Sequence, residues 1–333
     1  MSSAPSAQPI PSDARWLAQA LDPNSGLVRL IEMSPDAYRA ASFLDDRMLH
    51  APVVTQVRPF AEIAAAIPAE ARSDARWIFH IGHVGSTLVS RLLGELDGVL
   101  ALREPRILRD VALMPPALRG ESIPVIQQLL SRTFTANQTA LVKATSFVSE
   151  IAWQLVPPGE RALFLYADPR TYIATILAGE NSLRELHRLA DFRAQRMSAR
   201  VNGLALGDRA AHLAAAAWAC EMTALEAAAL AMADRQILWA SFDELLEDME
   251  VGMHRVAEFF GFQGSAARVG EIVRGPLMSR YSKSPNHEYS PALRRQLIDQ
   301  ELRLQGAEIE DALGMLQRAA EQSPLLAGAL VRG

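Results

Sequence analysis

The sequence has almost no cysteine, no excess of positive charge and no long run of strongly hydrophobic residues. Cys220 is the only cysteine among 333 residues, which excludes an intrachain disulfide and favours a reducing compartment. It lies in an alanine-rich apolar stretch, so we interpret it as a small core residue and not as a nucleophile. The formal net charge is −5, the pI is about 5.9 and no basic stripe stands out. We therefore expect no nucleic acid as a partner.

Further absences concern membranes, export and metals. The most apolar stretch, 213–233, owes its hydrophobicity to alanine and is interrupted by Glu221 and Glu226. We expect a packed helix there and no membrane partner. The first 15 residues lack the basic start and apolar run of a signal peptide, so we expect a disordered lead-in and a cytoplasmic protein. The seven histidines show no zinc-type spacing, and no metal is expected.

Short apolar runs alternate with helical patterns through the middle of the chain. The runs are 77–81, 98–102, 139–144, 161–167 and 235–242, and the helical patterns are 86–96, 121–135, 147–155, 170–178 and 209–233. Near-continuous apolar runs are typical of parallel strands buried on both faces. The alternation predicts an α/β fold with a doubly wound parallel sheet of the P-loop nucleotide-binding type. Ligands of such sheets bind beyond the carboxyl ends of the strands.

The chain divides into three parts by pattern. We expect residues 1–74 to form a partly disordered, helical extension, 75–265 the α/β domain, and 266–333 a C-terminal loop and helices that pack on the core. Residues 182–202 are helical and highly charged. We interpret them as a solvated helix, with a lid or a partner-facing helix as the alternative. The oligomeric state is left open, and a homodimer is one alternative.

The connection Gly82-His83-Val84-Gly85-Ser86-Thr87 joins the first strand to its helix. Glycines allow a tight turn that points backbone N–H groups at an anion, while the helix N-terminus and two hydroxyls add to the attraction. The alternative is that Ser86 only caps the helix and Gly85 only makes a turn. A Walker A loop requires a lysine before the hydroxyl residue, and none is present, so ATP or GTP hydrolysis is disfavoured.

This stretch, GHVGSTLVSRLL, resembles the 5′-phosphosulfate loop of sulfotransferases, which use 3′-phosphoadenosine 5′-phosphosulfate (PAPS) as donor. Gly85, Ser86 and Thr87 match the glycine and the two hydroxyl residues of that loop. His83 stands where the family has the lysine or arginine that stabilises the bridging oxygen. Histidine donates two hydrogen bonds only when protonated, so the resemblance implies a weaker or pH-dependent contact here.

Two later motifs extend the resemblance. Glu104 in LREPR resembles the general base of the tyrosylprotein sulfotransferase branch, and Arg106 matches a nearby family arginine. The alternative is a surface Glu104 paired with Arg103 or Arg106.

Lys143 ends the strand at 139–144, near the place where the family has a lysine close to the sulfuryl group. It could replace the cation missing at position 83, or it could simply extend to solvent.

Donor-binding positions of the family depart further from the pattern. An arginine and a serine bind the 3′-phosphate in sulfotransferases; here Ala167 takes the arginine position and Thr175 the serine position. Arg170 matches a second basic residue of that motif, or is a surface charge at a helix end. Arg280 and Lys283 fall near the family's late donor-binding loop, although a solvated turn is the default.

The resemblance spans about residues 76–285. It implies sulfuryl transfer from PAPS to a hydroxyl or amine of a small-molecule or peptide acceptor, without a metal. His83, Ser86, Thr87 and Lys143 would surround the transferring group, and Glu104 would deprotonate the acceptor. Two alternatives stay open. One is a small-molecule or nucleotide kinase-like phosphotransferase, which the missing loop lysine disfavours. The other is a non-catalytic anion- or nucleotide-binding P-loop protein, which the absent cations at 83 and 167 favour.

Overall fold

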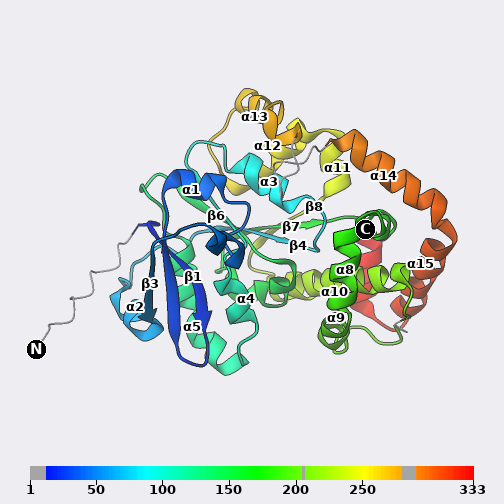
Figure 1. The fold of residues 1–333 in the computed structure, drawn as a ribbon, viewed down its shortest axis with the longest axis horizontal. Coiled ribbons are helices and arrows are strands. Elements are labelled where there is room, and N and C mark those ends of the chain that lie inside the picture. The colour runs from blue at the N-terminus through cyan, green and yellow to red at the C-terminus, as the bar shows by residue number, and fades with distance from the viewer. Residues whose placement is uncertain (1–12, 205–206, 280–289) are drawn as a thin grey trace, which may run out of the picture.

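A parallel five-stranded sheet forms the centre of the molecule in the computed structural model, which describes residues 13–204, 207–279 and 290–333 (Figure 1). Its strands are β4 (Arg76–His80), β5 (Val99–Arg103), β6 (Thr139–Lys143), β7 (Arg161–Tyr166) and β8 (Gln236–Ser241). They run in the order β5-β6-β4-β7-β8, and every neighbouring pair is parallel. All five predicted strands are confirmed, and so is the predicted α/β class.

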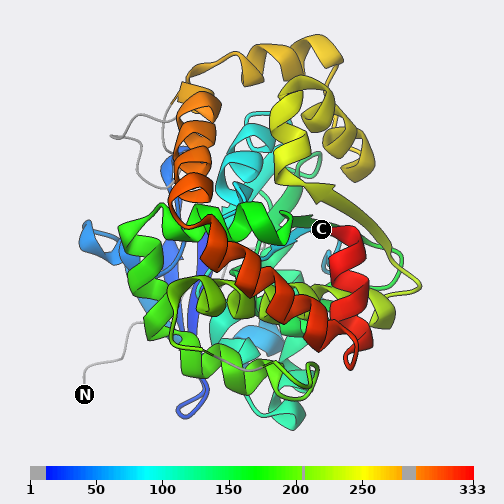
Figure 2. The ribbon, with the colours of Figure 1, turned by 90° about the vertical axis from the view of Figure 1, so that its right-hand side faces the viewer.

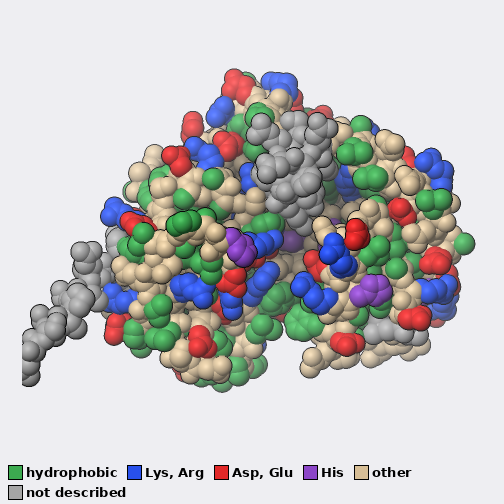
Figure 3. Space-filling view, viewed as in Figure 1, with side chains coloured by type: hydrophobic (Ala, Val, Ile, Leu, Met, Phe, Trp, Pro, Cys, Tyr) green, Lys and Arg blue, Asp and Glu red, His purple; other side chains and the backbone are tan. Residues whose placement is uncertain are grey.

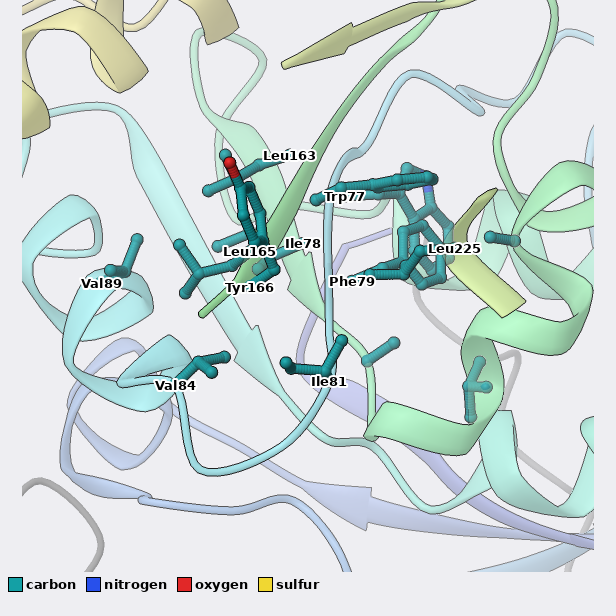
Figure 4. Packing of buried hydrophobic residues seen from close by; sticks show 14 of the residues in the cluster. Trp77, Ile78, Phe79, Ile81, Val84, Val89, Leu163, Leu165, Tyr166 and Leu225 are labelled. Atoms are coloured by element: carbon teal, nitrogen blue, oxygen red, sulfur yellow. The ribbon is translucent and has the colours of Figure 1, made fainter. Parts of the chain in front are cut away.

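Helices cover both faces of this sheet. On one face lie α3 (Ser86–Leu93) and α12 (Met249–Phe260), and on the other lie α10 (Ala210–Ala231) and the 3-10 turn η2 (Ser146–Ile151) (Figure 1). In β4, Trp77 and Phe79 stack with ring centroids 5.8 Å apart on the side of Leu225, while Ile78 points to the side of Val89 (Figure 4). Strands buried on both faces have no polar alternation, which explains the continuous apolar runs.

The remaining central helices are α4 (Ile107–Ala112), α5 (Pro116–Leu130), α6 (Ala152–Leu155), α7 (Pro169–Leu177), α8 (Glu180–Arg188), α9 (Ala190–Met197) and α11 (Phe242–Glu247). They lie close to predicted helical segments, except α4 and α11, which were not predicted. Helix α10 is long and apolar enough to cross a membrane by length and composition, but 78% of its most apolar stretch is buried inside the protein. Its Cys220 is fully buried, as predicted for a core residue, and burial raises the pKa of the thiol to about 12.

The helical expectation for the N-terminal part is wrong. Residues 13–74 contain an antiparallel sheet of β1 (Trp16–Asp22), β2 (Leu27–Glu32) and β3 (Thr55–Pro59), with α1 (Pro35–Ala40), η1 (Asp46–His50) and α2 (Phe60–Ala66). A tight turn at 22–26, with Gly26 at φ +66°, joins the first two strands. The Asp-Pro-Asn-Ser-Gly sequence of this turn was the overlooked signal. The predicted lead-in, apart from residues 13–15, lies outside the described residues.

The C-terminal part consists of α13 (Ala266–Val273), η3 (Pro276–Ser279), α14 (Pro291–Leu304), α15 (Gly306–Ala320) and α16 (Pro324–Arg332). Helices α14 and α15 pack on α7, and α15 and α16 pack on α10 (Figure 2). The chain therefore returns from the far side of the sheet and covers the helices that follow β7.

The charged segment 182–202 is not the solvated helix we expected. It forms most of α8 and all of α9, and three of its arginines, Arg193, Arg196 and Arg200, turn inward. Arg196 pairs with Glu221 at 2.8 Å, and Arg200 pairs with Glu150 at 2.6 Å. Arg193 is buried between the same helices, 8% exposed. Ion pairs thus fix one face of this segment to the core. A charged face of this kind has the same sequence pattern as a face that points to solvent, so the sequence could not separate the two.

Candidate active site

The loop between β4 and α3 has a backbone that only certain residues adopt easily. Gly82, His83 and Gly85 all have positive φ, at +83°, +54° and +62°. A Cβ added to Gly85 would lie 2.0 Å from the ring of Phe242, so the loop needs glycine there for space as well as for φ. Gly85 is the N-cap of α3 and no described side chain caps that helix. The interpretation of Ser86 as a simple cap is therefore wrong, and the first N–H groups of α3 are left for an anion.

His80 fixes the base of this loop. The backbone N–H of Gly82 donates to Nδ1 of His80 at 2.9 Å, and Nε2 lies 2.9 Å from the carbonyl oxygen of Ala144. Because Nδ1 accepts, the proton is on Nε2, which donates to Ala144, and the ring is neutral in this geometry. His80 ties the end of β4 to the end of β6. Its place as the last residue of the strand before the loop was the available sequence signal.

Lys143, Glu104 and Thr87 meet directly behind the loop. Lys143 ends β6 and is completely buried. Its Nζ donates to Thr87 Oγ1 at 3.3 Å and forms an ion pair with Glu104 Oε1. It is also one of only two lysines in the sequence. The interpretation of Lys143 as a side chain that extends to solvent is therefore wrong.

Glu104 is equally well enclosed, at 7% exposed, with a strained backbone at φ +52°. Burial raises its pKa, but the charge of Lys143, together with its hydrogen bond, outweighs burial and lowers the pKa to about 2. Glu104 is thus ionised at neutral pH. The alternative of a surface glutamate paired with Arg103 or Arg106 is wrong, because its partners are Lys143 and, at 3.5 Å, Arg47.

The two neighbouring arginines have separate partners. Arg103 donates to backbone carbonyls of Tyr38, Arg39 and Ala41, which anchors α1 to the end of β5. Arg106 pairs with Asp46 in η1 and with Asp110 in α4. Cationic and anionic side chains are interspersed over the face seen in Figure 3, in line with this pairing.

Arg47 and Phe43 complete the enclosure and were not identified from the sequence. The Arg47 guanidinium lies 3.3 Å from the centroid of the Phe43 ring, and Lys143 Nζ lies 5.8 Å from the same centroid. Arg47 also forms an ion pair with Asp45 at 2.6 Å. Both residues belong to the segment between the N-terminal strands, more than 50 positions from Glu104. No local motif connects them to it.

His83 lies at the front of the loop, facing helix α8. Its Nδ1 is 3.3 Å from Ser182 Oγ, and its Nε2 is 3.7 Å from Glu185 Oε1. The side chain of His83 is 16% exposed. His83 occupies the loop position where the resemblance implies a permanent cation, and the carboxylate of Glu185 lies beside it.

The residues predicted to hold the 3′-phosphate have other partners. Arg170 pairs with Glu310 on α15, and the hydroxyl of Thr175 donates to the carbonyl of Thr171 at 2.7 Å. Ala167 is buried, and its carbonyl accepts from Trp218 Nε1 at 2.9 Å. Arg280 and Lys283 lie outside the described residues. The structure groups Thr87, Lys143 and Glu104 and gives Arg170 and Thr175 contacts of their own.

A cavity of about 470 Å³ lies elsewhere, between α2 and the turn after α5. Residues of its lining, such as Arg72 and Phe134, come just before β4 and β6. It is therefore beside the amino ends of the strands, at the edge opposite the loop, where ligands of parallel sheets do not usually bind.

No family model matches this sequence, and no curated protein matches it. Among solved structures, the chain is similar to the sulfotransferase domain from the curacin biosynthetic pathway, with 12% identity and a TM-score of 0.42 over 69% of this chain and 91% of that one. A mouse sulfotransferase complexed with PAP gives 9% identity and a TM-score of 0.42, over 78% and 89%. Retinol dehydratase, in complex with androsterone and the inactive cofactor PAP, gives 14% identity and a TM-score of 0.34, over 92% and 97%. Similarity at this level assigns no function, which rests on the residues of the site.

Proposed function

We propose that this protein transfers a sulfuryl group from PAPS to a hydroxyl or amine of a small-molecule or peptide acceptor. One observation carries the proposal. The buried Lys143 contacts both the carboxylate of Glu104 and the hydroxyl of Thr87, where the carboxyl ends of β4, β5 and β6 meet. Group transfer between oxygens needs positioning and charge stabilisation more than covalent catalysis. Thr87, Lys143 and Glu104 supply a hydroxyl, a cation and a base within one enclosed space.

In this reaction the acceptor oxygen or nitrogen attacks sulfur, and the bond from sulfur to the bridging phosphosulfate oxygen breaks. The leaving group is adenosine 3′,5′-bisphosphate. Its 5′-phosphate gains the negative charge, which the N–H groups of the loop and the hydroxyls of Ser86 and Thr87 stabilise. Lys143 neutralises charge on the transferring group, and Glu104 takes the proton of the acceptor.

The Lys143–Glu104 ion pair makes the base conditional on the donor. With its pKa near 2, Glu104 is too weak a base to assist efficiently while Lys143 holds it. A sulfuryl group beside Thr87 competes for Lys143, because Nζ already lies within hydrogen-bond distance of that hydroxyl. As Lys143 turns toward the donor, Glu104 loses its strongest counter-charge and becomes more basic. Donor binding would thus prepare the base.

The loop fits the phosphosulfate end of PAPS, whereas the 3′-phosphate needs partners other than those of the family. Arg170 would have to leave Glu310, and Ala167 offers no side-chain donor. We include Arg280 and Lys283 in the proposal as donor-binding cations, and we propose a cytoplasmic location.

The test has a binding arm and a transfer arm. Calorimetry with adenosine 3′,5′-bisphosphate should show one site per chain, and ³⁵S-labelled PAPS should label an acceptor from a panel of phenols, alcohols, amines and tyrosine peptides. Glu104→Gln should retain binding and lose at least about a hundredfold in transfer rate. Glu160→Gln, which removes a carboxylate at the opposite edge of the sheet where it pairs with Arg76, is the matched control and should change neither.

A folded protein that binds no adenosine bisphosphate would contradict the proposal. Binding of ATP that requires Mg²⁺ would instead favour the phosphotransferase alternative. Binding of adenosine bisphosphate with no transfer to any acceptor, and with Glu104→Gln unchanged in every assay, would favour the non-catalytic alternative.

A further inference from the structure

We propose that Glu185 on α8 is a positioning residue that keeps His83 in its imidazolium form, so that the loop regains the cation that its sequence lacks. The inference rests on the proposed function and deepens it. Glu185 does not reach the reacting atoms in this proposal. It acts through His83, and Arg193 on α9 fixes it in place.

The geometry around His83 suits a ring with two N–H groups. Ser182 Oγ lies 3.3 Å from Nδ1, and Glu185 Oε1 lies 3.7 Å from Nε2. Both groups can accept, and they are three residues apart on one face of α8. A protonated histidine donates from both nitrogens, whereas a neutral one donates from only one. These neighbours accommodate the charged ring, with Ser182 as the acceptor and Glu185 as the counter-charge, and Glu185 is what favours it over the neutral ring, to which the Ser182 hydroxyl could donate instead.

His80, three residues earlier, shows the opposite arrangement. Its Nδ1 accepts from the N–H of Gly82, and its Nε2 donates to the carbonyl of Ala144, so this ring is held neutral. The two histidines at the ends of the loop's first turn are thus given different hydrogen-bond partners. One serves the backbone of the loop, and the other faces a carboxylate.

Charges from each neighbouring helix bear on His83. Arg193 Nη2 on α9 lies 3.5 Å from Glu185 Oε1, and Arg193 Nε lies 3.9 Å from Glu221 Oε1 on α10. Arg193 competes with His83 for Glu185, and Glu221, whose closer partner is Arg196 at 2.8 Å, offsets part of the charge of Arg193. On the other side of the loop, Lys143 and Glu104 form a pair with no net charge. Among the described residues, Glu185 is therefore an anion placed to favour the imidazolium.

Two consequences follow for the reaction. Transfer should weaken as the pH rises and His83 loses its proton, and Glu185 should move that loss to higher pH. Because the Glu185 side chain is 41% exposed, solvent screens part of its effect, and we expect a modest displacement.

The experiment follows each histidine directly. In ¹³C/¹⁵N-histidine NMR titrations, His83→Gln identifies the His83 resonance. Glu185→Gln should then lower the midpoint of the His83 titration by roughly half a pH unit or more. Glu185→Asp, which keeps the charge, should restore most of the difference. Glu180→Gln removes a carboxylate from the same helix, one that pairs with Arg184 at the surface, and should leave the midpoint unchanged.

The pH profile of transfer is the second readout, and its falling limb should move to lower pH in Glu185→Gln by the same amount. An unchanged His83 midpoint in Glu185→Gln overturns the inference, even if the protein is an active sulfotransferase. A lowered midpoint in a protein that transfers no sulfuryl group supports the ion pair while the proposed function fails. The two proposals can therefore fail separately.

Discussion

Two regions were predicted from the sequence to bind the donor: the loop between β4 and α3, and the start of α7. They differ in the burial of their side chains and in the contacts these make. At the loop end, Thr87, Lys143 and Glu104 come from three segments, are buried, and contact one another. At the start of α7, the side chain of Arg170 is half exposed and pairs with Glu310, and the hydroxyl of Thr175 donates within its own helix. A buried ion pair contributes little to stability compared with an apolar core, so its presence calls for another purpose. The difference supports our proposal that the chemistry takes place at the loop.

The largest effect is expected for Lys143→Met. The variant leaves the Glu104 carboxylate buried without its main counter-charge, and we expect a loss of about 3–5 kcal/mol in the free energy of unfolding. Adding Glu104→Gln should recover much of that loss, because the uncompensated charge is then removed. Urea denaturation of the single and double variants measures both. A single variant as stable as the parent would mean that the ion pair is not formed.

The second prediction concerns pH. Glu104 has a folded-state pKa near 2 and an ordinary value of 4.5, so its ionised form stabilises the fold by about 3 kcal/mol above pH 5. This contribution is lost as the pH falls from about 4.5 to about 2. The stability difference between the parent and Glu104→Gln should therefore shrink over that range. An equal stability difference between the parent and Glu104→Gln at pH 7 and pH 3 would contradict the lowered pKa of Glu104.

Gly85→Ala should have an intermediate effect. A positive φ costs an alanine about 1–2 kcal/mol, and the collision with Phe242 adds about 1–3 kcal/mol. Gly26→Ala is the matched control, because Gly26 has nearly the same φ, +66°, and open space around its Cβ position. Thermal unfolding and calorimetry with adenosine bisphosphate should separate the two variants. Equal stability losses would mean that the ring of Phe242 does not confine the loop.

Arg170→Ala should have the smallest effect. The exposed pair with Glu310 is worth at most about 1 kcal/mol, and donor affinity should stay within a factor of two. This variant also tests directly whether the start of α7 binds the donor. A tenfold or greater loss of affinity for adenosine 3′,5′-bisphosphate, with affinity for the 5′-monophosphate unchanged, would show that Arg170 leaves Glu310 to bind the 3′-phosphate.

The sheet could be predicted because its strands are buried on both faces and their apolar runs are continuous. The loop could be predicted because glycines and hydroxyls stand between a strand and a helix. The enclosure of Glu104 by Phe43 and Arg47 could not, since it depends on how a separate antiparallel sheet packs against β5. Nor could the contact between His83 and Glu185, because nothing in the charged segment 182–202 indicates which of its side chains face the core.

The packing of residues 38–47 against the end of β5 has a practical consequence for dividing the chain. The N–H of Leu44 donates to the carbonyl of Arg103 at 2.7 Å, and Arg103 in turn holds three carbonyls of 38–41. A fragment that begins at residue 75 would keep every strand of the central sheet. It would also open the Lys143–Glu104 pair to water and leave the Arg103 guanidinium without its three carbonyl acceptors. Residues 38–47 are thus one wall of the proposed active site, and a cut at residue 75 would remove it.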